Sequence, residues 1–150
     1  MKRIRTCILY PLSLSLALLL SSCEYYYTDG LFSGLWQVVS IEDRDNGTKE
    51  YPDGSAYYAF QRHMIQLSYF SEDKVVGDEP VYYVSYFTRE NDSLHVEPFR
   101  VNREEHKLAP LAELRRFGIY DGHTSFLIGE QGDKCMTLTS EEAVVTLRRH

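Results

Sequence analysis

Apolar and polar residues alternate with a period of two along most of the chain from Gly34 onward. Because the side chains of a strand point alternately to its two faces, this pattern predicts strands with one face turned to a core. The first such segment runs from Leu35 to Ile41. The alternation recurs at Tyr58 with Phe60, Ile65 with Leu67 and Tyr69, Leu94 with Val96, Phe126 with Ile128, Met136 with Leu138, and Val145 with Leu147.

Short polar breaks separate these segments. Those at 129–133 and 140–142 are short enough for hairpins, and Asn46-Gly47 marks a polar loop after the first strand. Evenly spaced short strands with tight turns favour an antiparallel meander, which best protects its edges by closing on itself. We therefore expect an all-β domain with one short helix, folded as an antiparallel up-and-down β-barrel of about eight strands.

One segment has helical spacing instead. Leu108, Leu111, Leu114 and Phe117 recur every three residues, Pro110 suits a first helical turn, and Gly118 suits a C-terminal cap. The spacing predicts a short helix over residues 109–117, which plugs or flanks the barrel.

The segment 81–88 departs from the alternation because both of its faces are apolar. Tyr82, Val84 and Tyr86 share one of these faces. A strand that is apolar on both sides is covered on both sides. The second cover is either the helix at 109–117, or a ligand or partner protein that uses the tyrosines as amphipathic contacts. These three residues therefore form a candidate binding face.

The N-terminus resembles the signal peptide of a bacterial lipoprotein. Basic residues at positions 2, 3 and 5 precede an apolar stretch over residues 8–21, which is too short to span a bilayer and leads into Leu20-Ser21-Ser22-Cys23. The resemblance implies cleavage before Cys23 and acylation of that residue. It divides the chain into a signal peptide (1–22), a lipidated tether (23–33) and a barrel domain (34–150). Residue 24 is Glu, and not the Asp of inner-membrane retention, so the outer membrane of a Gram-negative envelope is favoured.

The charge balance limits the partners. Loss of residues 1–22 removes three cations and no acid, so the formal charge goes from −6 to −9. This acidity argues against nucleic acid as a partner, because no basic stripe is available to displace counterions from phosphates. It also leaves membrane attachment to the lipid on Cys23.

The sequence has no recognisable catalytic or metal-binding motif. The five histidines lack metal-ligand spacing, and there is no nucleophile elbow or phosphate loop. Only Cys135 remains once Cys7 is removed and Cys23 is lipidated, so an intramolecular disulfide is excluded. We expect a protein that is not an enzyme and has no cofactor or metal.

Gly34-Leu35-Trp36 on the first strand, with a basic residue near the end of the last, resembles the lipocalins. The resemblance implies that Arg148 or Arg149 packs across the ring of Trp36 and closes the barrel. We assign barrel closure to Gly34, Trp36 and Arg149. Together with the lipobox, the layout is similar to the small lipocalin-like lipoproteins of Gram-negative bacteria.

Two functions follow from these observations. The first is a lipid-anchored barrel that binds a small apolar or aromatic ligand. The second is a packed barrel that acts as a structural or interaction module of the envelope and docks another protein on its tyrosine-rich face. A cavity supports the first function, and exposed Tyr82 and Tyr86 support the second.

Overall fold

The computed structural model describes residues 32–52, 55–70, 82–132 and 134–150. The signal peptide, Cys23, most of the tether and Val81 lie outside the described residues. No helix among the described residues is long and apolar enough to cross a membrane. The strands are β1 (Gly34–Asp43), β2 (Lys49–Glu50), β3 (Ala56–Gln61), β4 (Met64–Tyr69), β5 (Tyr82–Glu90), β6 (Ser93–Val96), β7 (Arg100–Val101), β8 (Glu104–Leu108), β9 (Thr124–Gln131), β10 (Cys135–Thr139) and β11 (Ala143–Arg149).

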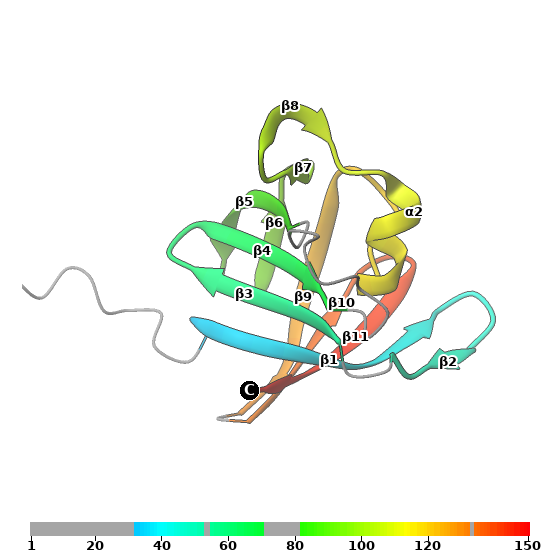
Figure 1. Ribbon diagram of the computed structural model, residues 1–150. Coiled ribbons are helices and arrows are strands. Elements are labelled where there is room, and N and C mark those ends of the chain that lie inside the picture. Colours follow the sequence, from blue (N-terminus) through cyan, green and yellow to red (C-terminus); the bar gives the residue numbers. More distant parts are fainter. Residues whose placement is uncertain (1–31, 53–54, 71–81, 133) are drawn as a thin grey trace, which may run out of the picture. The chain divides into compact units, whose positions relative to one another are not determined.

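Eight of the described strands form a closed antiparallel ring in the order β1, β3, β4, β5, β6, β9, β10, β11 and back to β1 (Figure 1). The ring closes where Trp36 of β1 lies opposite Arg149 of β11. The predicted fold class is therefore confirmed. The short strands β2, β7 and β8 extend the ring, since β2 pairs with β1, β7 with β5, and β8 with β7.

The alternating residues of the ring strands supply the core. A register shift between Val38 and Ser40 brings Ser40 and Ile41 both into buried positions, although they are adjacent in β1. Large side chains fill the interior at Trp36 and Tyr58, both fully buried. The other largest buried side chains are Phe117, Phe126, Ile65, Leu67, Leu94, Leu114, Ile119, Met136, Leu138 and Leu147.

The predicted helix is present as α2 (Leu111–Leu114) continued by the 3-10 turn η2 (Arg115–Phe117). Pro110 stands at its N-cap, and Gly118 ends it in the left-handed conformation at φ 78°. Leu114 and Phe117 are buried as expected. Leu108 and Leu111, which share the same spacing, are 57% and 45% exposed. Leu108 belongs to β8. Only the C-terminal half of the short helix faces the core.

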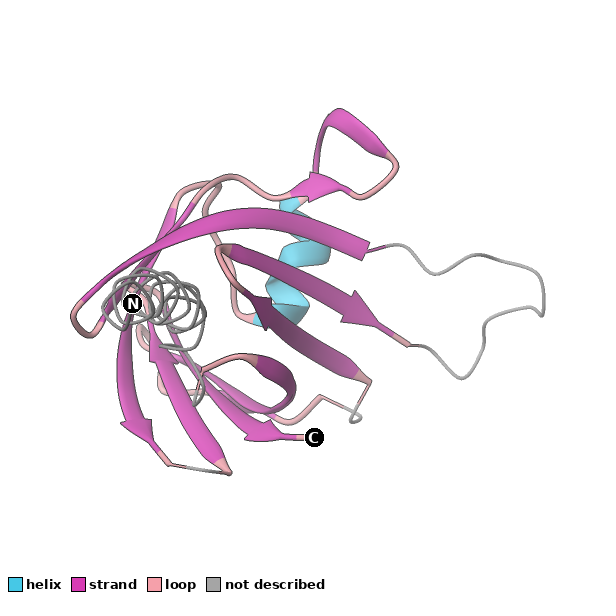
Figure 2. Cartoon of the chain, turned by 90° about the vertical axis from the view of Figure 1, so that its left-hand side faces the viewer, coloured by secondary structure: helices cyan, strands magenta, loops and turns pink. Residues whose placement is uncertain are grey.

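The helix covers one end of the barrel, which we call the helix end. The Tyr58 hydroxyl inside the ring donates a hydrogen bond to the Phe117 carbonyl oxygen. Gly118 lies against Val145 and Ile41, which are core residues of β11 and β1. Figure 2 shows the helix within the outline of the ring of strands. The opposite end, which we call the base, holds the start of β1, the end of β11 and the β3–β4 turn (Figure 1).

Candidate functional site

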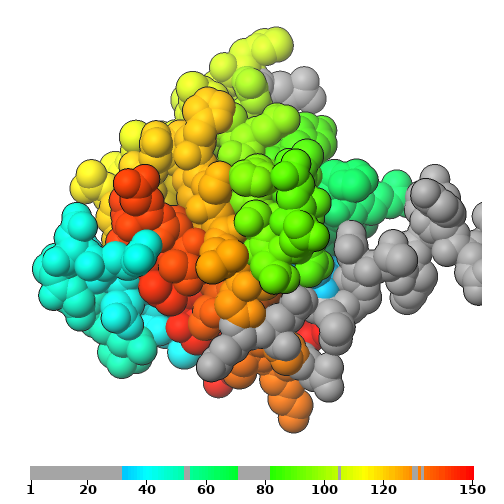
Figure 3. All heavy atoms as spheres, turned by 180° about the vertical axis from the view of Figure 1, so that it is seen from behind, coloured from blue at the N-terminus to red at the C-terminus, as the bar shows by residue number. Residues whose placement is uncertain are grey.

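A groove of about 540 Å³ lies on the outer side of β5 and β6. Its volume is within the range of small-molecule sites, and its lining is mostly apolar with a few polar groups. Figure 3 shows the face on which β5 and β6 (green) lie beside β9 (orange). The groove is lined by His63, Tyr86, Phe87, Thr88, His95, Val96, Glu97 and His123.

The strand alternation explains which side chains reach the groove. Phe87 and Val96 point inward and are buried in the core, so it is mainly their backbone that lies at the bottom of the groove. The neighbouring Tyr86 and His95 point outward, and both are exposed. The groove therefore combines a rigid floor of strand backbone with aromatic side chains at its walls.

Backbone hydrogen bonds hold the three sides of the groove together. The Phe87 N–H donates to the carbonyl oxygen of His63 in the β3–β4 turn, over 2.9 Å. The Glu97 N–H donates to the carbonyl oxygen of Tyr86, also over 2.9 Å. The groove is thus built on the sheet itself, which favours a preformed site.

Side-chain contacts orient part of the polar wall. The Nδ1 of His95 lies 2.9 Å from the Ser125 hydroxyl on β9, which fixes the ring plane. The Ser85 hydroxyl donates to the Glu97 carbonyl oxygen over 2.6 Å. Three imidazoles and one phenol can stack on an aromatic ligand and offer hydrogen bonds at its edge. Within the described part of the chain, no group of three His, Cys, Asp or Glu side chains is placed to hold a metal ion.

The structure divides the candidate binding face. Tyr86 is 63% exposed and lines the groove. Tyr82 and Val84 are half-buried and lie farther along β5, opposite Ser68 and Gln66 of β4. The helix packs against the core side of the ring, so the alternative in which it covers the outer face of β5 was wrong.

The residues assigned to barrel closure meet at the base. The guanidinium carbon of Arg149 lies 5.6 Å from the ring centroid of Trp36, and its Nη2 donates to the Ser33 carbonyl oxygen over 2.9 Å. Gly34 has a φ of 132°, and a Cβ there would meet the Arg149 guanidinium at 3.5 Å. The Trp36 indole N–H donates to the Phe32 carbonyl oxygen.

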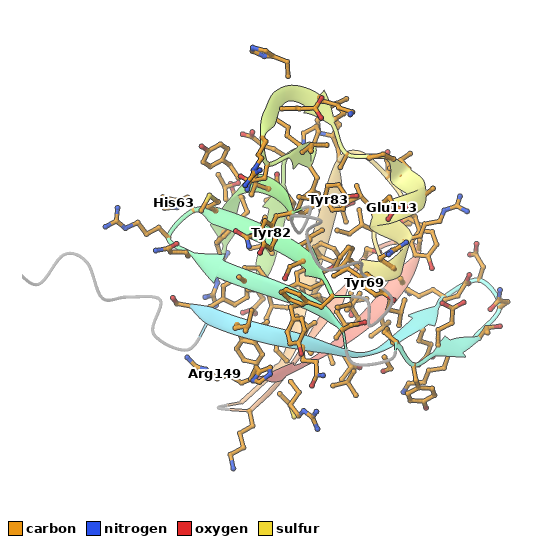
Figure 4. All side chains as sticks on the ribbon, viewed as in Figure 1. His63, Tyr69, Tyr82, Tyr83, Glu113 and Arg149 are labelled. Carbon is orange, nitrogen blue, oxygen red and sulfur yellow. The ribbon has the colours of Figure 1, made fainter. Side chains whose placement is uncertain are left out.

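A second polar cluster lies beside the helix, at the end opposite Arg149 (Figure 4). Arg116 pairs with Glu113 at 2.9 Å and lies 4.4 Å from the ring centroid of Tyr69. Burial raises the pKa of the nearby Tyr83, as does the charge of Glu113, while Arg116 opposes the shift. These contacts secure the helix to β4 and β5.

No sequence pattern indicates that three histidines line one groove. His95 stands at an outward position of a predicted strand, between Leu94 and Val96, so its exposure follows from the alternation. His63 and His123 lie in connections, where no period applies. The pairing of β5 with β4 and β6, and of β6 with β9, brings these residues to Tyr86.

Comparison with known proteins agrees with this architecture. Residues 18–150 match the sequence profile of the lipocalin-like domain family. No curated protein matches the sequence. A lipocalin-like protein from Bacteroides uniformis has a similar structure, with a TM-score of 0.57 and 17% identity over 79% of this chain and 97% of that one. An uncharacterized protein from Bacteroides eggerthii has a TM-score of 0.59 and 17% identity over 79% and 99% of the two chains. At this identity the likeness concerns the fold alone.

Proposed function

This chain belongs to the lipocalin-like domain family, and on that premise we propose that it is a lipid-anchored envelope lipoprotein that binds a small apolar or aromatic ligand. We place the ligand in the outer groove of β5 and β6. The lipobox ending at Cys23 supports the anchor, in the outer membrane of a Gram-negative bacterium. The absence of a catalytic motif from the sequence supports binding, and not catalysis, as its activity.

The groove is the observation that carries this proposal. It has the volume of a small-molecule site, a rigid floor on strands β5 and β6, and an exposed ring at Tyr86. The interior of the ring is a less favourable place, because Trp36 and Tyr58 occupy it with fully buried rings. An aromatic or apolar molecule would gain most by covering the exposed ring of Tyr86.

A second candidate function is docking of another envelope protein on the tyrosine-rich face. The 63% exposure of Tyr86 favours it, because exposed aromatic side chains are common anchors of protein interfaces. Tyr82 and Val84, half-buried on the same side of β5, would extend such an interface beyond the groove.

Titration with phenylnaphthylamine, whose fluorescence rises in apolar sites, tests the groove. We expect saturable binding that Tyr86→Ala weakens by about 5- to 30-fold, as for other aromatic anchors. Tyr51→Ala is the matched control, since Tyr51 is 70% exposed and lies outside the groove. Equal affinity of the two variants would refute the groove as the site.

Native mass spectrometry of the chain purified from its own envelope separates the two candidates. A retained small molecule that is lost in Tyr86→Ala supports ligand binding. A retained protein that is lost only when Tyr82 and Tyr86 are both replaced by Ala supports docking, provided that the melting temperature of the variant is unchanged.

A further inference from the structure

Cationic side chains gather at the base of the barrel, where the chain enters β1. All of them are exposed, and they come from four separate segments of the chain. The set, which we call the basic rim, consists of Arg62, Arg89, Lys134, Arg148 and Arg149. Arg148 and Arg149 are adjacent in the sequence, and the other three cations join them only in the folded barrel.

Two of the segments meet at the C-terminal strand. The Arg149 N–H donates to the Lys134 carbonyl oxygen over 2.9 Å, and Arg148 lies opposite Cys135 in the register of β10 and β11. Because Arg149 also donates to the carbonyl oxygen of Ser33, these cations stand directly beside the point where the tether joins the barrel.

The other two segments meet at Phe32, the first residue that the structure describes. The Arg89 guanidinium carbon lies 5.5 Å from the Phe32 ring centroid. The Phe32 ring centroid lies 4.2 Å from that of Phe60. Phe60 lies near the end of β3, next to the β3–β4 turn that carries Arg62. Arg89 and Arg149 therefore lie directly beside Phe32 and Ser33, and Arg62 and Lys134 lie in neighbouring turns of the base.

The two ends of the barrel differ in charge balance, with the cations Arg44, Lys49, Arg115 and Arg116 lying among the acidic residues of the helix end. Among the described side chains, the acidic ones at the base are Glu90 and Asp92, in the β5–β6 turn. Acidic residues gather instead at the helix end, in the β1–β2 hairpin and the β10–β11 turn. These are Glu42, Asp43, Asp45, Glu50, Glu141 and Glu142.

We propose that the basic rim docks on anionic lipid headgroups of the membrane that holds the protein, so that the barrel stands base-down. This inference rests on the proposed lipid anchor at Cys23. The ten residues 24–33 that follow Cys23 reach at most about 33–36 Å when fully extended, so the anchor holds the base near the bilayer. A net charge of −9 does not oppose the contact, because salt screens charges farther than about 10 Å from the surface.

This orientation also has a consequence for the groove. His63, which lines the groove, is adjacent to Arg62 of the basic rim in the β3–β4 turn. One wall of the groove would thus lie next to the headgroups, where an apolar ligand could pass between the lipid phase and the protein.

The test measures energy transfer from a fluorophore on the full-length mature lipoprotein to headgroup-labelled lipid in vesicles. Cys135 is exposed at the base and is the free cysteine that accepts the label. A second protein, Cys135→Ser with Asp45→Cys, carries the label at the helix end. In phosphatidylcholine vesicles that contain phosphatidylglycerol, we expect strong transfer from Cys135 and weak transfer from position 45. High salt, or vesicles of pure phosphatidylcholine, should reduce the difference in energy transfer between the two labels.

Variants of the basic rim make the test specific. We expect a triple variant to lose the stronger energy transfer from the base: it combines Arg62→Gln, Lys134→Gln and Arg148→Gln. Each removed cation weakens binding to an anionic surface by roughly fivefold. The matched control replaces the exposed Lys49, Arg103 and Lys107 by Gln and should retain the stronger transfer from the base. Equal transfer from both labels, or equal loss in both triple variants, would overturn the docking.

Flotation with pure phosphatidylcholine vesicles distinguishes this proposal from the anchor on which it rests. Flotation together with equal transfer from both labels overturns the docking but leaves the anchor standing. Failure to float overturns the anchor, and the docking with it. Ligand binding in the groove is measured independently of either result.

Discussion

The guanidinium of Arg149 covers the ring of Trp36 at 5.6 Å, so the last strand and the first are joined by their side chains as well as by their backbones. Trp36 is fully buried beneath this contact, and its indole N–H is satisfied by the Phe32 carbonyl oxygen. The pair closes the base of the ring, where β1 and β11 lie side by side but are far apart in the sequence and are not connected by a turn.

Replacement of Trp36 by alanine should lower the free energy of unfolding by about 3–5 kcal/mol, because it leaves a large cavity at the closure of the ring. Urea denaturation followed by circular dichroism measures the change. Tyr51→Ala serves as the comparison and should cost less than about 1 kcal/mol, as at other exposed sites. A loss below about 1 kcal/mol for Trp36→Ala would mean that the base is not held by this residue.

Replacement of Arg149 by glutamine should lower the free energy of unfolding by about 1 kcal/mol, because it removes the cation–π contact and the hydrogen bond to Ser33 at a partly solvated site. Arg148→Gln is a neighbour with the same change of charge, and its side chain bonds Gln37 on the outer surface. We expect a smaller loss for Arg148→Gln. Equal losses would show that charge alone, and not the contact with Trp36, accounts for the effect.

Replacement of Cys23 by serine should release the protein from the membrane, because the hydroxyl cannot form the thioether that carries the lipid. Fractionation of cells followed by mass spectrometry of the N-terminus checks this. Cys135→Ser changes a different exposed thiol and should leave the protein in the membrane fraction. If Cys23→Ser stays bound to the membrane and unmodified Cys23 is found in the parent protein, the lipobox interpretation is wrong.

The period of two predicted the barrel well because almost every strand has one face in the core and one in solvent. The same alternation also decides between the two candidate arginines. Leu147 points inward, so Arg149 does too and reaches Trp36, whereas Arg148 points outward to Gln37. Parity along a strand is a local property, and it can be read from the sequence.

The short strands and the groove could not be read in this way. Strands β2 and β7 have two residues each, which is too short for any period to appear. Leu108 fits the helical spacing but lies in β8, because spacing alone does not show where a helix begins. Tyr86 was found because its strand lacks a polar face. His63 and His123 reach it from connections, through pairings that only the closed ring creates.

Tyr58 makes the stability of the barrel sensitive to high pH. Its ring is fully buried, and burial raises the pKa of its hydroxyl far above the ordinary value of 10.0. In the unfolded chain the hydroxyl ionises near that ordinary value, so above about pH 10 the unfolded state binds fewer protons than the folded state. The contribution of Tyr58 is therefore complete below pH 10 and is lost as the pH rises, by up to about 1.4 kcal/mol per pH unit.

Tyr58→Phe should remove this part of the pH dependence, which denaturation at a series of alkaline pH values measures. At neutral pH the variant should lose about 1–2 kcal/mol, because the Phe117 carbonyl oxygen loses its donor. Tyr83→Phe is the comparison: burial raises the pKa of Tyr83 too, but Tyr83 lies nearer the surface, so its replacement should change the alkaline slope less. The same alkaline slope in Tyr58→Phe as in the parent protein would contradict the assignment.

Gly118 joins the helix to the barrel, and its replacement by alanine should be strongly destabilising. Its φ of 78° is a left-handed conformation that a side chain disfavours, and an added Cβ would overlap Cγ2 of Val145 in the core. We expect a loss of more than about 2 kcal/mol of unfolding free energy, from backbone strain and overpacking together. Gly122→Ala is the control, because nothing lies within 4 Å of its Cβ position. If Gly118→Ala were as stable as Gly122→Ala, the helix could move away from β11, and it would be a mobile cover and not a fixed plug.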